Sequence, residues 1–421
     1  MNLKLKSLIF LSTIFLLLCS SSCEKKSVDI DPSKLSDPIK IDLRSSAEKA
    51  ILRSDQNFAF DIFSNVFNEE LKDEDNNFMI SPFSLSMALA MTWNGAGGTT
   101  KEAMRNTLKL GDYSDDEVNG YYKKLKEALL KTDPTTKLSI ANSIFTNQYV
   151  PIKSTFIKTN EDFFDATIQS VNFGDPGTVS LINKWASDNT NNLVKKVLDK
   201  TDPQDLMYLL NAIYFKGIWS SKFDSKNTNR QDFTYENGAI KKVDMMHLTA
   251  DLRYSEDELM QIVELPYGNK AFSMYVLLPK SGKQLKDLNA ALTTQDYWKT
   301  LIAGFSKAEV YLSLPKFKTE YSKKLNDALT NMGMGEAFTD AADFSGMSDA
   351  SAKIAFVKQD TYISTDESGT EAAAVSTVGV ALTSIGISDK VIFNANHPFL
   401  YVIQENSTGA ILFMGTIKNF E

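Results

Sequence analysis

The 421-residue chain is predicted to form a single α+β domain with large, mostly antiparallel β-sheets. Helical periodicity dominates its first part, and apolar runs typical of strands dominate its second half. Strands and helices do not alternate regularly, which argues against a parallel α/β sheet. No change in composition marks a linker within residues 46–421, so this range is interpreted as one domain.

The helices are expected mainly in the first half of the chain. Apolar residues recur at helical spacing over residues 46–70, which predicts an amphipathic helix. In "SPFSLSMALAMTW", Ser81 can cap a second helix, and the proline after it fits the first turn. Thr99 and Glu102 have the spacing of a capping box that opens another helix. A further helix is predicted over residues 180–198.

The second half is richer in strands. The run "LMYLLNAIYFKGIW" has the apolar and aromatic composition of a buried central strand. The last two runs, "FLYVIQ" and "AILFMGTI", predict a hairpin around Asn406–Gly409. The strands expected from such patterns are residues 138–147, 206–219, 272–279, 310–318, 353–365, 399–404 and 410–417.

The N-terminus has the features of an export signal. Lys4 and Lys6 precede an apolar run that is too short to span a bilayer, so residues 1–22 are predicted to be a signal peptide. Small residues then precede Cys23, as at a bacterial lipoprotein cleavage site. We therefore expect a lipidated Cys23, a polar tether over residues 23–45, and attachment to the membrane of a bacterial cell envelope. The side of the membrane is left open.

The match to a lipoprotein site is imperfect. Ser20 stands where an aliphatic residue is usual, and Cys19 is a poorer candidate because bulky Leu18 precedes it. Plain secretion after cleavage nearby is the alternative. Cys19 and Cys23 are the only cysteines, so the mature domain has no disulfide, no cysteine nucleophile and no thiolate metal site.

Residues typical of catalysis are scarce. His247 has no serine or aspartate pattern beside it, and His397 precedes a proline, so both are expected to be structural. The sequence lacks a Gly-x-Ser-x-Gly elbow, a phosphate loop and a His-Glu-x-x-His motif. The net charge of −8 does not suggest a nucleic-acid partner. We expect no enzymatic activity, no metal and no cofactor, with an unrecognised surface hydrolase as the alternative.

Residues 369–388, "GTEAAAVSTVGVALTSIGIS", have an unusual composition for a soluble protein. In a strand, one face would be uncharged, and the other would carry Glu371, the sole charge. Gly379 and Gly386 weaken the segment as a permanent strand. Either it is a buried strand, or it is first displayed as a loop that proteases can cut. The uncharged face comprises Thr370, Ala372, Ala374, Ser376, Val378, Val380 and Leu382.

Several motifs occur in the order that is typical of one protein family. They include "NFMISPFSLSMALAMTWNGAGGTTKEAM", "LLNAIYFKGIW", "LPKFK", "MGMGEAF", "DFSG", "DESGTEAAA", "ANHPFLYVI" and "FMGTI". With them, residues 46–421 resemble the serpins, the family of serine protease inhibitors. The resemblance implies a monomeric α+β domain of three β-sheets and eight or nine helices, with an exposed reactive-centre loop.

Residues 369–388 are similar to that reactive-centre loop. The resemblance implies that a target protease attacks a loop carbonyl and forms a covalent acyl-enzyme. The cut loop then inserts as a new strand in the central sheet, where fourteen residues span about 46 Å. The protease is carried to the far end of the sheet, its oxyanion hole and triad are distorted, and deacylation fails.

The resemblance also assigns roles within the loop. The scissile bond is implied at Thr383–Ser384, with Leu382, Ile385 or Ile387 as alternates because the loop looks longer than usual. The range 369–388 contains no Lys or Arg, which favours elastase-like, subtilisin-like or papain-like targets over trypsin-like ones. The hinge comprises Glu367, Gly369, Thr370, Glu371, Ala372, Ala373, Ala374 and Ser376.

The hinge has no proline and no inward charge, which favours an inhibitor. The alternative is a non-inhibitory serpin-like scaffold, or a substrate that is merely cut.

Two further clusters are implied by the resemblance. The breach cluster, where the loop begins to insert, comprises Trp219, Lys316 and Glu367, and the resemblance implies that Lys316 pairs with Glu367. The shutter cluster, beneath the mid-sheet opening point, comprises Ser81, Ser84, Asn211 and Gln359.

Gln359 stands at a shutter position where the family usually has a histidine. A glutamine amide can also donate and accept hydrogen bonds. We therefore expect altered energetics of sheet opening rather than loss of the mechanism.

Overall fold

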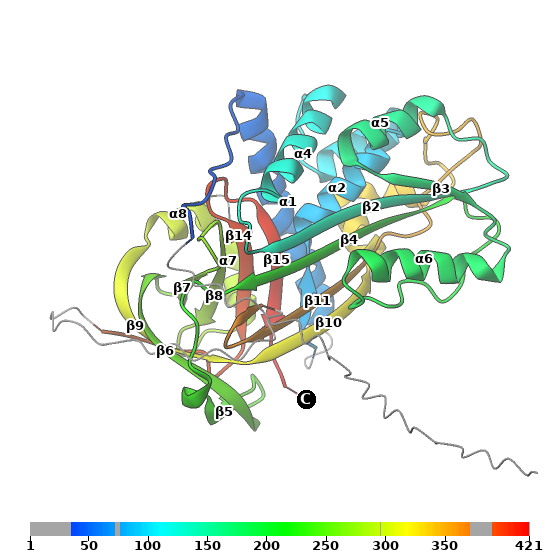
Figure 1. The fold of residues 1–421 in the computed structure, drawn as a ribbon. Coiled ribbons are helices and arrows are strands. Elements are labelled where there is room, and N and C mark those ends of the chain that lie inside the picture. The colour runs from blue at the N-terminus through cyan, green and yellow to red at the C-terminus, as the bar shows by residue number, and fades with distance from the viewer. Residues whose placement is uncertain (1–34, 72–75, 295, 371–389, 421) are drawn as a thin grey trace, which may run out of the picture. The chain divides into compact units, whose positions relative to one another are not determined.

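The computed structural model describes residues 35–71, 76–294, 296–370 and 390–420, and within them nine α-helices accompany two β-sheets (Figure 1). Helices dominate the N-terminal half and strands the C-terminal half, which confirms the α+β class. The helices are α1 (Ser46–Glu70), α2 (Pro82–Trp93), α3 (Gly98–Thr107), α4 (Asp115–Leu129), α5 (Ser154–Phe164), α6 (Pro176–Asn189), α7 (Leu285–Leu292), α8 (Tyr297–Ala303) and α9 (Asn326–Leu329). Short helical turns are η2 (Ser225–Asn227), η3 (Thr330–Met334) and η4 (Gly335–Phe338).

The first sheet has six strands in the order β10-β11-β12-β4-β2-β3. Its strands are β2 (Lys137–Asn147), β3 (Thr167–Val171), β4 (Met207–Ile218), β10 (Phe317–Lys324), β11 (Lys358–Asp366) and β12 (Gly369–Thr370). β12 is antiparallel to both of its neighbours, so β4 and β11 run parallel to each other on either side of it.

The second sheet has nine strands in the order β1-β15-β14-β8-β7-β6-β9-β13, with β5 on β6. Its strands are β1 (Phe78–Ile80), β5 (Asn229–Thr234), β6 (Ile240–Glu256), β7 (Met260–Pro266), β8 (Phe272–Pro279), β9 (Ser306–Pro315), β13 (Val391–Asn394), β14 (Phe399–Glu405) and β15 (Ile411–Ile417). The long β6 pairs with β9 and also with β7. The strands on either side of β6 therefore form one hydrogen-bonded sheet, and the described residues form two sheets where three were expected.

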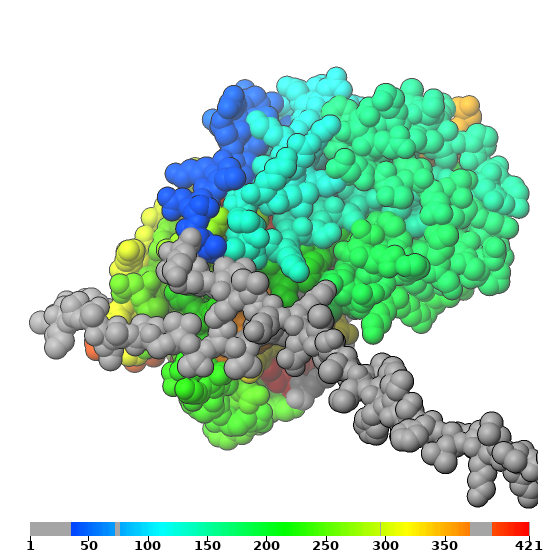
Figure 2. All heavy atoms as spheres, viewed as in Figure 1, coloured from blue at the N-terminus to red at the C-terminus, as the bar shows by residue number. Residues whose placement is uncertain are grey.

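Two apolar clusters cover opposite faces of the six-stranded sheet. The larger one includes Ile213 and Phe215 of β4 together with residues of α1 and α2. The smaller one lies under α6 and includes Tyr208 and Leu210 of β4. We call the α2 side the inner face and the α6 side the outer face. Figure 2 shows that the segments from α1 to α6, coloured blue to green, form the upper and right-hand surface in that view.

The helix predictions were correct for α1 and partly wrong elsewhere. Residues 46–70 form α1 as expected, and its N-cap, Ser45, makes a capping box with Glu48. The expected box at Thr99 is absent, because α3 already begins at Gly98 and the Thr99 hydroxyl donates to Glu336. The predicted helix over 180–198 stops at Asn189 in the structure.

The strand predictions were correct in position but not always in extent. Residues 310–318 belong to two strands, because β9 ends at Pro315 and β10 begins at Phe317. β11 begins at Lys358, so the first five residues of the predicted strand 353–365 are irregular. The C-terminal hairpin of β14 and β15 is confirmed.

The packed domain includes residues before Ser46. Ile41 and Leu43 are buried, and the Ile41 amide donates to the Ser407 hydroxyl at 2.9 Å. The Thr132 hydroxyl donates to the Ile39 carbonyl at 2.5 Å. The end of the range predicted as a polar tether therefore packs against the fold, because it carries apolar side chains among its polar ones.

A buried carboxylate lies where α1, α2 and α4 meet. Asp55 of α1 accepts hydrogen bonds from the hydroxyls of Tyr121 and Tyr122 on α4, at 2.7 and 2.8 Å. Burial raises the pKa of Asp55 to about 6, although hydrogen bonds from Tyr121, Tyr122 and Ser86 partly oppose the shift. At a given pH, the protonated form of Asp55 is therefore more populated in the folded chain than in the unfolded chain.

This carboxyl group makes stability depend on pH. Its contribution is complete below the ordinary pKa of 3.8 and is lost as the pH rises through about 6. We expect the wild-type domain to be about 1 kcal/mol more stable at pH 5 than at pH 7 from this group, and Asp55→Asn to remove the difference. Chemical unfolding at both pH values measures it, with Asp61→Asn on the same helix as the control. An unchanged pH dependence in Asp55→Asn would contradict the assignment.

Candidate functional site

Two residues occupy the interval between β4 and β11 at one end of the sheet. Gly369 pairs with Ile218 and Asp366, and Thr370 pairs with Gly217 and Thr365. A Cβ atom on Gly369 would lie 2.0 Å from the Gly217 carbonyl oxygen, and Gly369 has φ +152°. Only glycine fits this approach, because the backbones are too close for a side chain. The glycine of the expected hinge is thus explained by contact between two backbones.

Aromatic side chains cover this end of the interval. Trp219 is buried and stacks on Tyr267 with a centroid distance of 4.5 Å and an interplanar angle of 13°. Its indole N–H donates to the Asp366 carbonyl at 2.9 Å. The hydroxyl oxygens of Tyr267 and Thr370 are 2.6 Å apart and share a hydrogen bond. The stack therefore contacts both the turn that leads into β12 and β12 itself.

An ion pair joins the same turn to the neighbouring strands. Lys316, between β9 and β10, lies 2.7 Å from Glu367, whose carboxylate also accepts from the Thr228 hydroxyl at 2.7 Å. Burial acts to raise the pKa of Glu367, but the hydrogen bonds from Lys316 and Thr228 outweigh it and hold the pKa below its ordinary value. Burial raises the pKa of the adjacent Asp366. The structure thus brings all three predicted breach residues, Trp219, Lys316 and Glu367, to the turn before β12.

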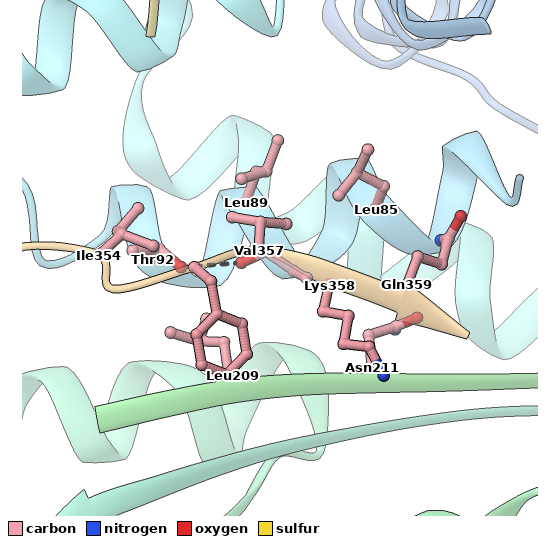
Figure 3. A pocket seen from close by; sticks show the side chains of 11 residues that line it. Leu85, Leu89, Thr92, Leu209, Asn211, Ile354, Val357, Lys358 and Gln359 are labelled. Carbon is pink, nitrogen blue, oxygen red and sulfur yellow. Dashed lines mark hydrogen bonds between the residues drawn. The ribbon is translucent and has the colours of Figure 1, made fainter. Parts of the chain in front are cut away.

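Beyond Thr370, β4 and β11 share no hydrogen-bonded register within the described ranges. A narrow cavity of about 20 Å³ lies between them, which is room for about one water molecule. Figure 3 shows Leu85 and Leu89 of α2 on one side of this cavity and Leu209 and Asn211 of β4 on the other. The interval is therefore closed from the inner face by α2.

Gln359 attaches β11 to the start of α2. Its side-chain N–H donates to the Ser81 carbonyl at 2.9 Å, and its oxygen accepts from the Ser81 amide at 2.8 Å. Ser81 occupies the N-cap position, but its hydroxyl donates to the Leu412 carbonyl at 2.7 Å instead of capping the helix. The expected side-chain cap was therefore wrong. Its hydroxyl ties α2 to β15, and the Gln359 amide ties Ser81 to β11.

The other two shutter residues lie nearby with unsatisfied groups. Asn211 donates to the Asn142 side chain of β2 at 2.7 Å. The Asn211 side-chain oxygen and the Ser84 hydroxyl are buried and lack a hydrogen-bond partner among the described residues. Within the shutter cluster, Gln359 and Ser81 are thus hydrogen-bonded through their side chains, whereas the Asn211 oxygen on β4 and the Ser84 hydroxyl on α2 lack partners among the described residues.

Several predicted residues lie outside the described part of the chain. These are the signal peptide with Cys23, the hinge residues Glu371, Ala372, Ala373, Ala374 and Ser376, and the cleavage-site residues Leu382, Thr383, Ser384, Ile385 and Ile387. Among the described residues, no helix is long and apolar enough to cross a membrane. In the same ranges, no three His, Cys, Asp or Glu residues are grouped as metal ligands.

Tyr267 and Thr228 were not among the residues predicted from the sequence. Tyr267 follows β7 in "ELPYGNK", and no local signal connects it with Trp219 or Thr370, because the three residues meet only in the folded chain.

The histidines have the contacts expected of structural residues. His247 contacts Gln231 and Ser313 at 3.0 and 2.9 Å, and burial lowers its pKa.

Comparison with known proteins agrees with this geometry. Residues 53–420 match the family model described as Serpin (serine protease inhibitor). Intracellular coagulation inhibitor 2 of Tachypleus tridentatus is 37% identical over 83% of this chain and 87% of its own length. Serpin I2 of Homo sapiens is 30% identical over 89% of this chain and 93% of its own length. The chain therefore belongs to the serpin family, whose members are generally protease inhibitors rather than enzymes.

Solved structures share the fold. The thermophilic serpin tengpin in its native state has a TM-score of 0.81 and 32% identity, covering 92% of this chain and 98% of its own. Human thyroxine-binding globulin complexed with its ligand has a TM-score of 0.79 and 26% identity, covering 89% of this chain and 99% of its own. The expected fold class is confirmed by these similarities.

The contact between Gln359 and Ser81 can be tested with an isosteric change. In Gln359→Glu, a carboxylate cannot donate to the Ser81 carbonyl and is repelled by it, which costs on the order of 3 kcal/mol at pH 7. The new group has a raised folded-state pKa, so the lost stability returns as the pH falls. Chemical unfolding at pH 7 and pH 4.5 measures both effects. Gln404→Glu is the control for the cost of burying a carboxylate, because the Gln404 side-chain oxygen accepts from the Trp298 indole N–H and a carboxylate could still do so. A loss in Gln359→Glu no larger than that in Gln404→Glu would contradict the role of the donor.

Proposed function

We propose that this serpin is a suicide-substrate inhibitor of proteases. A protease cleaves the reactive loop and is held as an acyl-enzyme while the loop enters the interval between β4 and β11. The observation that carries the proposal is β12, whose two residues already pair with both strands at one end of that interval. A strand that continued from Thr370 would supply hydrogen-bonding groups to both strand edges at once.

The register of β12 supports insertion with the expected face inward. Position 376 is six residues after Thr370, and its partners would be six residues before Gly217 on β4 and six before Thr365 on β11. Those partners are Asn211 and Gln359, so a serine hydroxyl would arrive beside the unsatisfied Asn211 oxygen. The buried Thr370 side chain lies on the inner face, so in an inserted strand the small even-numbered residues that follow it would face inward as well.

The composition of the loop supports a class of target. Residues 369–388 contain no Lys or Arg, so a trypsin-like pocket that binds a cation finds no anchor there. Small and aliphatic side chains fit the pockets of elastase-like and subtilisin-like serine proteases. We propose these as targets, with cleavage between Thr383 and Ser384.

Trapping is tested by mixing the mature chain with an elastase and a subtilisin. We expect an SDS-resistant adduct on denaturing gels and, by intact mass, a released peptide that begins at Ser384. In Ala374→Arg an inward charge should block insertion, so the loop is cut without an adduct. Ala373→Arg is the matched control, because the same change on the opposite face should preserve trapping. Adducts of equal yield from both variants would contradict the inward face.

A non-inhibitory serpin is the second candidate. The similarity to human thyroxine-binding globulin supports it. That protein has the same fold, and its solved structure is a complex with a small ligand. Cleavage of the wild-type loop by every protease class without an adduct and without a gain in thermal stability would favour this alternative.

We further propose that Cys23 is lipidated and anchors the protein in a bacterial cell envelope. Small residues before Cys23 and the short apolar run before them support this. Metabolic labelling with a fatty-acid analogue should mark the wild type and Cys19→Ser but not Cys23→Ser, which should leave the membrane fraction. Labelled Cys23→Ser would contradict the anchor and favour plain secretion.

A further inference from the structure

The chain segment 190–198 lies on the outer face of the six-stranded sheet, between α6 and the chain that leads into β4. Asn183 of α6 holds its end, because the Asn183 oxygen accepts from the amides of Val197 and Leu198 at 2.8 and 2.9 Å. The Asn183 amide also donates to the Leu198 carbonyl at 2.9 Å. Val197 and Leu198 are buried in the apolar cluster that includes Tyr208 of β4. This end of the segment is therefore hydrogen-bonded to α6 and packed on the β4 side of the interval, with Phe356, two residues before β11, also packed against the same cluster.

Lys358, the first residue of β11, reaches that segment from the other side of the interval. Its ammonium group donates to the Val197 carbonyl at 2.8 Å and lies 2.8 Å from Asp360. The side chains of Lys358 and Asp360 are only 19% and 11% exposed, so water competes weakly for both contacts. The neighbouring Gln359 points to Ser81 on the inner face, as alternation along a strand requires. The start of β11 is thus held on both faces.

The two contacts of Lys358 differ in what strand insertion does to them. Adding one strand between β4 and β11 moves them apart by about 4.8 Å. Asp360 lies on the same strand as Lys358 and moves with it, so their ion pair can persist. Val197 is attached to α6 and the β4 side, so its contact with Lys358 at 2.8 Å cannot survive that displacement.

We propose that Lys358 is a positioning residue that holds the interval between β4 and β11 closed through the Val197 carbonyl, and so limits the rate of loop insertion. The inference rests on the proposed insertion mechanism. Because the contact exists before insertion and is broken by it, Lys358 stabilises the uncleaved form relative to the inserted one. A faster rate of insertion without Lys358 follows from this difference.

The test compares the double variant Lys358→Met/Asp360→Asn with the single variant Asp360→Asn. Asp360 is replaced in both variants, so neither leaves a buried carboxylate without its cation. We expect the double variant of the mature chain to convert on heating to the inserted, heat-stable form about tenfold faster, as for the loss of one hydrogen bond from a charged donor. The thermal midpoint of its loop-cleaved form should be unchanged, because the contact is absent there. The single variant Lys358→Arg should convert to the inserted form at the wild-type rate, since a guanidinium can donate to both the Val197 carbonyl and Asp360.

A matched control is Lys184→Met combined with Asp188→Asn, which removes an exposed pair within α6 and should leave the rate unchanged. An unaltered or slower rate in the Lys358 variant would overturn the inference, and so would equal destabilisation of the uncleaved and cleaved forms. If the wild type gains no thermal stability on loop cleavage, the proposed function and this inference both fail. If it does gain stability and the variants match it in rate, only the inference fails.

Discussion

The six-stranded sheet depends on how one interval between two parallel strands is filled. β4 and β11 each need a neighbour for their facing edges, and Gly369 and Thr370 are the described residues that pair with both. A strand edge without a partner leaves donors and acceptors that must find other bonds or remain unsatisfied. The contacts at this interval, on both faces of the sheet, therefore decide how easily the two strands can separate.

Different interactions close different parts of the interval. At the end where β12 enters, Trp219 stacks on Tyr267, and Lys316 pairs with Glu367. Further along, Gln359 bonds to the backbone of Ser81 on α2. The buried Asn211 oxygen has no partner among the described residues, and such groups cost about 1–3 kcal/mol each. The closed arrangement thus combines strong contacts with groups that an added strand could satisfy.

The errors in the predicted helices have different physical origins. The helix predicted over 180–198 ends at Asn189, because Asn191 and Asn192 have positive φ angles of 52° and 63°, which a right-handed helix does not allow. The capping box at Thr99 does not form, because the Thr99 hydroxyl donates to Glu336 instead. In this second case a residue far along the chain supplies a contact that outweighs the local preference.

The sequence by itself determined the α+β class and the position of α1 and most strands, because helical and strand periodicities are local properties. The alternating faces expected after Thr370 remain a prediction, because those residues lie outside the described part of the chain. The family motifs identified Trp219, Lys316, Glu367 and Gln359 and implied the pair of Lys316 with Glu367, but not the contacts of Trp219 and Gln359. Only the tertiary structure decided that Tyr267 shares a hydrogen bond with Thr370 and that Lys358 donates to Val197 across the interval. Such contacts join residues that are more than a hundred positions apart, so packing alone brings them together.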